Sequence, residues 1–456
     1  MNHTRVKELT SGSPMKLILG FTTPLLFGFL FQQLYSFVDT AIVGRYLGSE
    51  SLAAVGDTGS INFLVLGFCQ GFCAGFSIPV AQAFGAGDYK LLRQTVANSV
   101  YLAGFISVLM AIFSALFCPT MLRLMDTPPQ ILPQSVAYIR IVFLGIPATI
   151  LYNLSSGILR ALGDSKTPVI FLVLASLVNI VLDLVLILYA RMGVAGAAVA
   201  TVLSQIVSGI GCVVIMKKRF PILHLSAQDR ILRMPLVRSL AGIGLPMGLQ
   251  YAITAVGSVM VQWSVNSLGV IPVAAVAAGS KISVFFCCIF DALATTMATY
   301  AGQNMGARKL NRISQGVKCA SLIGIIYCLL ALAAIFLLDS RLLSLFVNPQ
   351  KDPEVMKLAC HYLRLNGLFY IPLLFVNILR LTIQGMGFTR IAMLAGVFEM
   401  IARMLVALLL VPSLAFNGAC LANPAAWVLA DCFLFPCYFH VMHMVYERFH
   451  EPRATV

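Results

Sequence analysis

The segment Gln82-Ala83-Phe84-Gly85-Ala86 returns about 221 residues later as Gln303-Asn304-Met305-Gly306-Ala307. Further pairs keep nearly this spacing: Ala53-Ala54-Val55 with Ala274-Ala275-Val276, Ile146-Pro147 with Ile371-Pro372, Gly163 with Gly387, and Gly196-Ala197-x-x-Ala200 with Gly418-Ala419-x-x-Ala422. The spacing drifts by only a few residues, as loops of different length in two copies require. Duplicated membrane bodies are a common plan of secondary transporters, because two halves can move about a shared site. The repeat therefore predicts two homologous halves.

Composition places these halves in a membrane. Hydrophobic residues make up 59% of the 456 residues and charged residues only 11%, with a mean hydropathy of +0.92. Apolar runs recur, each long enough to cross about 30 Å of hydrocarbon. We expect an all-α integral membrane protein with twelve transmembrane helices in two six-helix lobes related by pseudo-two-fold symmetry. The first 13 residues are polar and hold no cleavage motif, so the first span should stay in the protein.

Each half contains six apolar spans. The predicted spans are 15–43, 51–82, 91–118, 131–158, 166–190 and 194–216 in the first half, and 238–268, 272–303, 313–338, 355–385, 388–411 and 418–446 in the second. The polar, basic stretch between the halves predicts a cytoplasmic linker at 217–237, with lobes at 1–216 and 238–456. Because six is even, equivalent spans run in the same direction, as in parallel-repeat transporters.

The formal charge of +14 has an uneven distribution along the chain. Lys and Arg gather in alternate loops, above all between Lys217 and Arg238, whereas the intervening loops carry fewer. This positive-inside pattern orients a membrane protein and places both termini in the cytoplasm. We therefore expect membrane lipid, and no nucleic acid, as the partner of the basic surface.

Cysteine and histidine give no sign of a cofactor. The twelve cysteines are scattered along apolar stretches without zinc-ligand or redox spacing, and buried cysteine behaves as a small hydrophobe. No nucleophile with a base, or pair of histidines with a carboxylate, stands at usable spacing. We expect no enzyme activity and no cofactor.

Five acidic residues fall inside apparent spans: Asp39, Asp183, Asp291, Glu399 and Asp431. A charge at the bilayer centre costs about 2.5–3.5 kcal/mol on insertion scales, so such residues normally face a cavity or the bundle interior. They are candidates for function by default, with Asp291 and Asp431 the weaker ones because either could lie near an interface.

The first half gathers carboxylates and neutral oxygens. Tyr35 and Asp39 are spaced i,i+4 and project from one helix face, and Asn179 and Asp183 repeat that spacing on the fifth span. Either Na⁺, through oxygen ligands, or a proton, through a buried carboxyl, could use such a cluster; a purely structural hydrogen-bonded pair is the alternative. The expected coupling site is Tyr35, Asp39, Asn153, Asn179, Asp183 and Thr201, with Na⁺ possible at Asp39, Asn179, Asp183 and Thr201.

The repeat tests this cluster internally. Asp39 aligns with Val261, and Asp183 aligns with Ala407. The second copy of the fold lacks both acids, so the fold does not require them. Coupling chemistry is therefore expected in the first half only.

Two further features are candidates for function. Glu399 and Arg403 stand i,i+4 on the eleventh span and could neutralise one another or contact a cation or substrate. Pro24 lies in the span of Asp39, and proline inside a helix removes a backbone donor and favours a bend. We expect Pro24 to act as a conformational hinge; static packing geometry is the alternative.

These motifs resemble the multidrug and toxic compound extrusion (MATE) family, on its prokaryotic DinF-like side. The resemblance covers essentially the whole chain. Its motifs are Gln33-Leu34-Tyr35-x-x-x-Asp39-x-x-x-Val43-Gly44, Leu159-Arg160-Ala161-x-Gly163-Asp164, Asn179-x-x-x-Asp183 and Ala301-x-Gln303-Asn304-x-Gly306-Ala307.

The resemblance implies a V of two six-helix lobes in a prokaryotic plasma membrane, with a first-lobe cation site at the six residues named above and a first helix that bends at Pro24. It implies export of organic cations driven by inward Na⁺ or H⁺. We expect a monomeric antiporter working by alternating access on a small organic cation. Other branches of the family use acidic residues on the seventh and tenth helices. This chain has Gln250 on the seventh span and no acidic residue on either span. A flippase for lipid-linked saccharides is the alternative within the superfamily, and a channel is disfavoured because no filter-like loop repeats.

Overall fold

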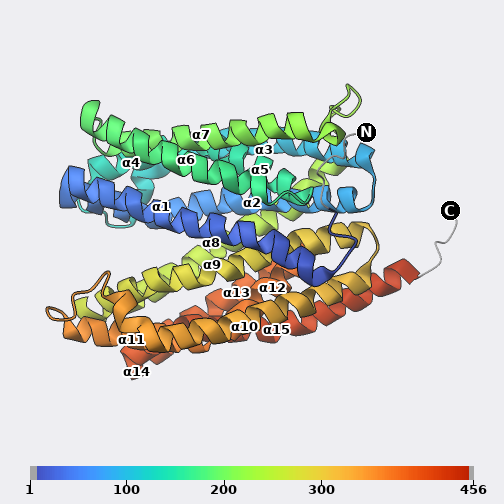
Figure 1. Ribbon diagram of the computed structural model, residues 1–456. Coiled ribbons are helices and arrows are strands. Elements are labelled where there is room, and N and C mark those ends of the chain that lie inside the picture. Colours follow the sequence, from blue (N-terminus) through green and yellow to red (C-terminus); the bar gives the residue numbers. More distant parts are fainter. Residues whose placement is uncertain (1–7, 451–456) are drawn as a thin grey trace. The chain divides into compact units, whose positions relative to one another are not determined.

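The computed structural model describes residues 8–450, which are helical apart from short connections and contain no strand. Residues 1–7 and 451–456, where the sequence places both cytoplasmic ends, lie outside the described residues. The long helices of each half lie lengthwise beside one another (Figure 1). In chain order the elements are α1 (Pro14–Asp57), α2 (Gly59–Gly85), α3 (Tyr89–Leu124), α4 (Leu132–Leu144), α5 (Ile146–Ala161), α6 (Lys166–Leu184), η1 (Val185–Tyr189), α7 (Val194–Arg219), η2 (Pro221–Leu223), α8 (Met234–Asn266), α9 (Val270–Gly306), α10 (Leu310–Leu343), α11 (Pro353–Leu368), α12 (Tyr370–Gly385), α13 (Thr389–Leu405), η3 (Val406–Leu410), α14 (Val411–Leu414) and α15 (Phe416–His450).

Twelve membrane spans account for these helices. Between residues 8 and 450, ten helices are long and apolar enough to cross a membrane, and two bent pairs bring the number to twelve when each pair is one span. The pairs are α4 with α5, bent by 45°, and α11 with α12, bent by 50°. Pro147 is the second residue of α5 and Pro372 the third residue of α12, positions in the first turn where a missing N–H costs no intrahelical bond. The predicted all-α fold with twelve spans is confirmed.

Internal contacts divide the chain into two units. Residues 23–252 form the body of unit 1, and residues 10–22 together with the chain from residue 253 onward form unit 2. Two helices therefore pass from one unit to the other: α1 between Thr22 and Thr23, and α8 between Ala252 and Ile253. The first turns of α1 therefore belong to unit 2, and the first half of α8 belongs to unit 1. The division expected from the sequence, at 217–237, places these two segments the other way round.

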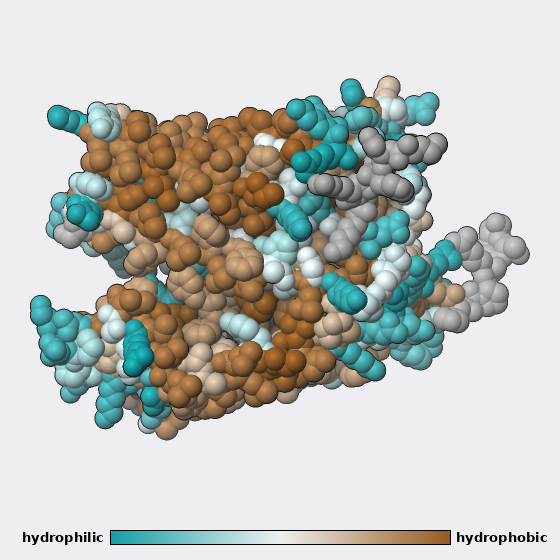
Figure 2. Space-filling view, viewed as in Figure 1, coloured by the Kyte–Doolittle hydropathy of each residue, from teal (hydrophilic) through white to brown (hydrophobic). Residues whose placement is uncertain are grey.

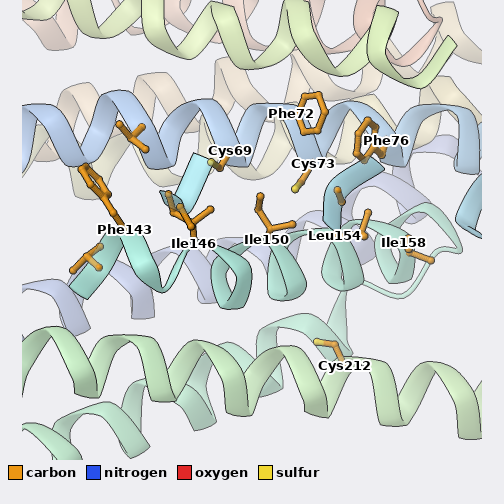
Figure 3. Packing of buried hydrophobic residues seen from close by; sticks show 14 of the residues in the cluster. Cys69, Phe72, Cys73, Phe76, Phe143, Ile146, Ile150, Leu154, Ile158 and Cys212 are labelled. Carbon is orange, nitrogen blue, oxygen red and sulfur yellow. The ribbon is translucent and has the colours of Figure 1, made fainter. Parts of the chain in front are cut away.

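The core of unit 1 lies between α2 and α5. Figure 3 shows Phe72 and Phe76 of α2 on one side and Ile150 and Leu154 of α5 on the other. The two phenylalanine rings meet edge to face, with centroids 4.6 Å apart. Cys73, on the same helix, is buried with a free thiol and fills space as a small apolar side chain.

Glycine brings α2 against the first half of α8 inside unit 1. A Cβ added at Gly75 would stand 2.6 Å from the Cα of Gly244, and one added at Gly71 would stand 2.5 Å from the carbonyl oxygen of Met247. Small residues allow such approaches in membranes, where close packing replaces the hydrophobic effect as the force between helices. The two backbones come into direct contact here.

The outer surface is apolar along the helices. Phe105, Leu116 and Leu330 are about two-thirds exposed, and Figure 2 shows brown apolar side chains over the helix flanks with teal polar side chains gathered at helix ends. Water would penalise such exposure, whereas lipid tails do not. The chain is a multi-pass membrane protein.

The connection between η2 and α8 is tied to α3 within unit 1. Arg93 donates from Nε to Asp229 Oδ2 at 2.9 Å, and the Asn98 side-chain oxygen accepts from the Arg233 backbone N–H at 2.9 Å. Ser226 donates to the same Asp229 oxygen at 2.7 Å. The hydrogen bonds from Ser226, followed by the Arg93 guanidinium, lower the pKa of Asp229 to about 2.

Candidate functional site

The predicted first-half cluster starts from α1. Tyr35 and Asp39 lie one turn apart and are both half-buried, while the residues between them are exposed. The helical spacing thus turns both polar groups toward unit 1 and leaves Phe37 and Val38 outward. α1 presents a phenol and a carboxyl on one face.

The last turn of α6 supplies the second carboxyl. Asn179 and Asp183 are fully buried, and the helix continues directly into the π-helix η1, Val185–Tyr189. A π-turn widens the helix locally and is frequent at functional sites. In the amide orientation that satisfies both partners, Asn179 donates to Asp183 Oδ2 at 2.8 Å and accepts from the Thr201 backbone N–H at 3.0 Å.

The carboxyl groups of Asp39 and Asp183 lie close enough to interact directly. Two carboxylates have no donor between them, so a direct hydrogen bond would need a proton on one of the two groups. The Oδ1 atoms of both are buried and find no partner among the described residues. The pair therefore offers buried carboxyl oxygens of the kind that can hold a proton or coordinate an alkali cation.

Two hydroxyl groups complete this pocket, which we define as Tyr35, Asp39, Asn179, Asp183 and Thr201. The Tyr35 phenol lies beside the Thr201 hydroxyl. Thr201 Oγ1 also donates to the Ala197 carbonyl of α7 at 3.0 Å, which fixes its position. Three helices, α1, α6 and α7, thus contribute to one pocket inside unit 1.

Tyr138 of α4 is a member that the sequence reasoning missed. It is 8% exposed and faces both Asp39 and Asp183. A tyrosine within an apolar span has a polar end that needs a partner, and that signal could have marked it.

Asn153 is different: its amide donates to the Thr149 carbonyl of its own helix at 2.8 Å, and no described contact links it to the carboxyls. Its part in the pocket stays a prediction.

Pro24 lies in an uninterrupted stretch of α1. In α1 only Gly48 departs from helical geometry, with φ 85° and ψ 177°. A Cβ added at Gly28, one turn beyond Pro24, would stand 2.8 Å from Val169 of α6. The helix near Pro24 is straight-running and closely packed, so its role as a hinge stays a prediction.

The second-half pair has a third partner. Arg403 Nη2 lies 3.5 Å from Glu399 Oε2, and Arg380 of α12 donates from Nη1 to Glu399 Oε1 at 2.8 Å. All three residues are less than a tenth exposed. The sequence indicated the i,i+4 pair but gave no sign of Arg380, which comes from another helix.

Comparisons with known proteins identify the family. The MatE family model matches residues 24–185 and 246–409, once in each half, as the internal repeat predicts. The probable multidrug resistance protein YoeA of Bacillus subtilis (strain 168) is 29% identical over 338 residues, covering 73% of each chain. The probable multidrug resistance protein YpnP of the same organism is 29% identical over 373 residues, covering 81% of this chain and 82% of that protein.

A solved structure shows the same fold. It is described as the outward-facing conformation of a multidrug resistance MATE family transporter of the MOP superfamily, with a TM-score of 0.90 and 22% identity. The match covers 98% of this chain and 100% of that chain. The family resemblance predicted from the sequence motifs is confirmed.

Proposed function

Because this chain belongs to the MatE family of membrane transporters, we propose that it is an antiporter that exports organic cations by alternating access. The driving ion is H⁺ or Na⁺, entering at the pocket of Asp39 and Asp183. The relatives YoeA and YpnP are described as probable multidrug resistance proteins, which supports a drug-like substrate. The positive-inside distribution of Lys and Arg supports a plasma-membrane protein with both termini cytoplasmic.

The observation behind this proposal is the close approach of Asp39 and Asp183. The two carboxyls come from α1 and α6, and each has one buried oxygen without a partner among the described residues. A fixed structural bridge would satisfy its oxygens. Groups left unsatisfied in a buried place indicate a site that gains a partner during its working cycle.

Coupling requires that the ion prefer one conformation. A ligand shifts a conformational equilibrium only by the difference between its affinities for the two states. The pocket joins α1 to α6 and α7, so any movement of α1 separates Asp39 from Asp183 and removes the shared proton site. Ion binding therefore favours the conformation seen here, in which the carboxyls meet.

α1 is placed to transmit this preference. Its residues from Thr23 onward belong to unit 1, whereas the turns before Thr23 belong to unit 2. Pro24 lies next to that change, and it frees the carbonyl one turn earlier from helical hydrogen bonding. A bend at Pro24 would let the Asp39 end of α1 move while its first turns stay with unit 2.

Reconstituted vesicles test the function. The purified protein is placed in proteoliposomes loaded with ethidium, and dye efflux is measured under a sodium gradient and, separately, a pH gradient. We expect efflux with at least one gradient and its loss in Asp39→Asn. Asp57→Asn is the matched control, since Asp57 lies on the same helix but accepts from Thr127 at 2.6 Å. Full gradient-driven efflux by Asp39→Asn contradicts the proposal.

A further inference from the structure

The connection from η2 to α8 carries apolar side chains on its outer surface. Ile231, Leu232 and Met234 are each more than half exposed, within four consecutive residues. Single exposed apolar residues are ordinary, but a group of them is costly in water and indicates a partner. Residues 230–234 therefore form a surface that something apolar covers.

The inner side of this segment bonds to α3 through its backbone. Tyr101 donates from its hydroxyl to the Arg230 carbonyl at 3.0 Å. Asn98 donates to the Ile231 carbonyl at 3.4 Å and accepts from the Arg233 N–H at 2.9 Å. Lipid offers no such partners, so an irregular segment that enters a membrane needs them from the protein. Two side chains of α3 supply them here.

The length of α3 places these contacts at the edge of the hydrocarbon. Its 36 residues span about 54 Å at 1.5 Å per residue, whereas the hydrocarbon is about 30 Å thick. A helix centred in the bilayer extends beyond it by about eight residues at each end, so Asn98 and Tyr101 lie just inside the boundary. Val100, Tyr101 and Phe105 are exposed at this level. The apolar side chains of residues 230–234 thus extend a surface that faces lipid.

The charges around this segment suit an anionic membrane surface. The linker at 217–237 holds five basic residues and a single acid, Asp229, whose carboxylate is paired with Arg93 at 2.9 Å. Arg230 and Arg233 are exposed and lie on either side of the first two apolar residues. Anionic headgroups lie just outside the hydrocarbon and attract basic residues held there.

We propose that residues 230–234 are a membrane anchor. Ile231, Leu232 and Met234 enter the acyl chains of the nearer leaflet, and Arg230 and Arg233 bind the headgroups of anionic phospholipids. In the orientation proposed above, this is the cytoplasmic leaflet. The inference concerns the surface of unit 1 and does not depend on the ion that drives transport.

The anchor determines where α8 begins. The Arg233 carbonyl accepts from the Val237 N–H at 3.0 Å, which closes the first turn of that helix. The first half of α8 packs on α2 where Gly244 meets Gly75, and the second half belongs to unit 2. Lipid bound at residues 230–234 therefore holds the unit 1 end of a helix that continues into unit 2.

Tryptophan fluorescence tests the insertion. The two native tryptophans, Trp263 and Trp427, are replaced by phenylalanine, and Leu232→Trp is added. Gln228→Trp in the same background is the matched control, because Gln228 is exposed on the polar turn before this segment. In vesicles with brominated acyl chains, the indole at position 232 should emit at shorter wavelength and be strongly quenched, while the indole at position 228 should keep its emission.

Two outcomes of this measurement overturn the proposal. The first is the same emission wavelength and the same quenching at positions 232 and 228. The second is a blue-shifted indole at position 232 that brominated lipid does not quench, since a protein surface, such as a second copy of this chain, would then cover the segment.

Mixed vesicles of phosphatidylcholine and phosphatidylglycerol test the headgroups, with bromine on only one of the two lipids. The indole at position 232 should be quenched more when phosphatidylglycerol carries the bromine. Arg230→Gln combined with Arg233→Gln should remove this difference, whereas Lys351→Gln, at an exposed residue of unit 2, should keep it. Equal quenching by the two lipids without these changes overturns the binding of anionic headgroups.

These measurements are separate from the test of antiport. They use no gradient and no dye, and both leaflets of the vesicles have the same composition. A protein without gradient-driven efflux, or with the opposite orientation, would still show the quenching expected of a membrane anchor.

Discussion

At the residue scale, the pocket of unit 1 places two hydroxyl groups beside its carboxyls. Thr201 lies beside the Tyr35 phenol and donates its hydroxyl proton to the Ala197 carbonyl. Tyr35 reaches the pocket one turn before Asp39 on α1. The phenol and the hydroxyl thus bring α1 next to α7 beside Asp39.

Thr201→Ala should weaken ion binding without abolishing it. The variant loses the hydroxyl but keeps the backbone N–H that Asn179 accepts from, and one neutral hydrogen bond contributes about 1 kcal/mol. We expect the half-maximal driving-ion concentration for ethidium efflux to rise about fivefold. Ser208→Ala on the same helix, whose hydroxyl bonds only its own helix carbonyls at 3.0 and 3.2 Å, should leave it unchanged. Equal effects in the two variants would argue against a role for Thr201 in the pocket.

At the element scale, close packing of α2 on α8 determines the stability of unit 1. Gly71→Ala places a methyl group 2.5 Å from the Met247 carbonyl oxygen, so one backbone must shift. Overpacking of this kind costs about 1–3 kcal/mol. We expect a lower melting temperature in detergent, followed by intrinsic fluorescence or a thiol-reactive dye.

Gly104→Ala on α3 provides the control for this prediction. An added Cβ at Gly104 meets no atom within 4 Å, and alanine also favours the helix over glycine. Its melting temperature should equal or exceed that of the wild type. Similar melting temperatures for Gly71→Ala and the wild type would contradict tight packing of α2 on α8 at Gly71.

The linker is a second element with its own prediction. Asp229 has a pKa lowered to about 2, so its ionised form stabilises the linker above the ordinary carboxyl range near pH 4. That contribution is lost as pH falls through about 2. Asp229→Asn removes it at neutral pH. We expect faster tryptic cleavage after Arg230 and Arg233 in the variant, measured by limited proteolysis; an unchanged cleavage rate would mean that Arg93 does not retain the linker.

At the scale of the whole molecule, we expect Pro24 to be the hinge of α1, whose turns before Thr23 belong to unit 2 and whose remainder belongs to unit 1. Pro24→Ala restores a backbone hydrogen bond and stiffens the helix at the change from unit 2 to unit 1. Stabilisation of the straight helix by about 1.4 kcal/mol slows bending tenfold. We expect ethidium efflux to slow by about that factor while ion binding at equilibrium stays normal.

The control for this prediction is another helical proline. Pro119 lies inside α3, which belongs wholly to unit 1, and Pro119→Ala should leave the efflux rate near that of the wild type. Equal slowing by both substitutions would indicate a general effect of removing membrane prolines, and would count against a hinge at Pro24.

Much of this molecule could be predicted from its sequence, because repeats and helical spacing are local signals. The paired motifs gave the two halves, and the i,i+4 spacing gave Asn179 with Asp183 and Glu399 with Arg403. Arg380 and Tyr138 could not be found this way, since each meets its partners from another helix and no spacing along the chain encodes that meeting. For the same reason, no local pattern shows that α1 and α8 each run from one unit into the other, because that depends on which neighbours the helix ends contact.

This exchange of helix ends has a consequence for synthesis. The Thr22 hydroxyl shares a hydrogen bond of 2.9 Å with Thr296, and Lys309 donates to the Thr10 carbonyl at 2.9 Å, both within unit 2. The ribosome makes residues 10–22 first, yet their partners emerge hundreds of residues later. The first turns of α1 are therefore inserted into the bilayer before the residues that they contact have been made. A C-terminal fragment produced alone lacks these turns and should mature only when the N-terminal fragment is supplied in the same cell.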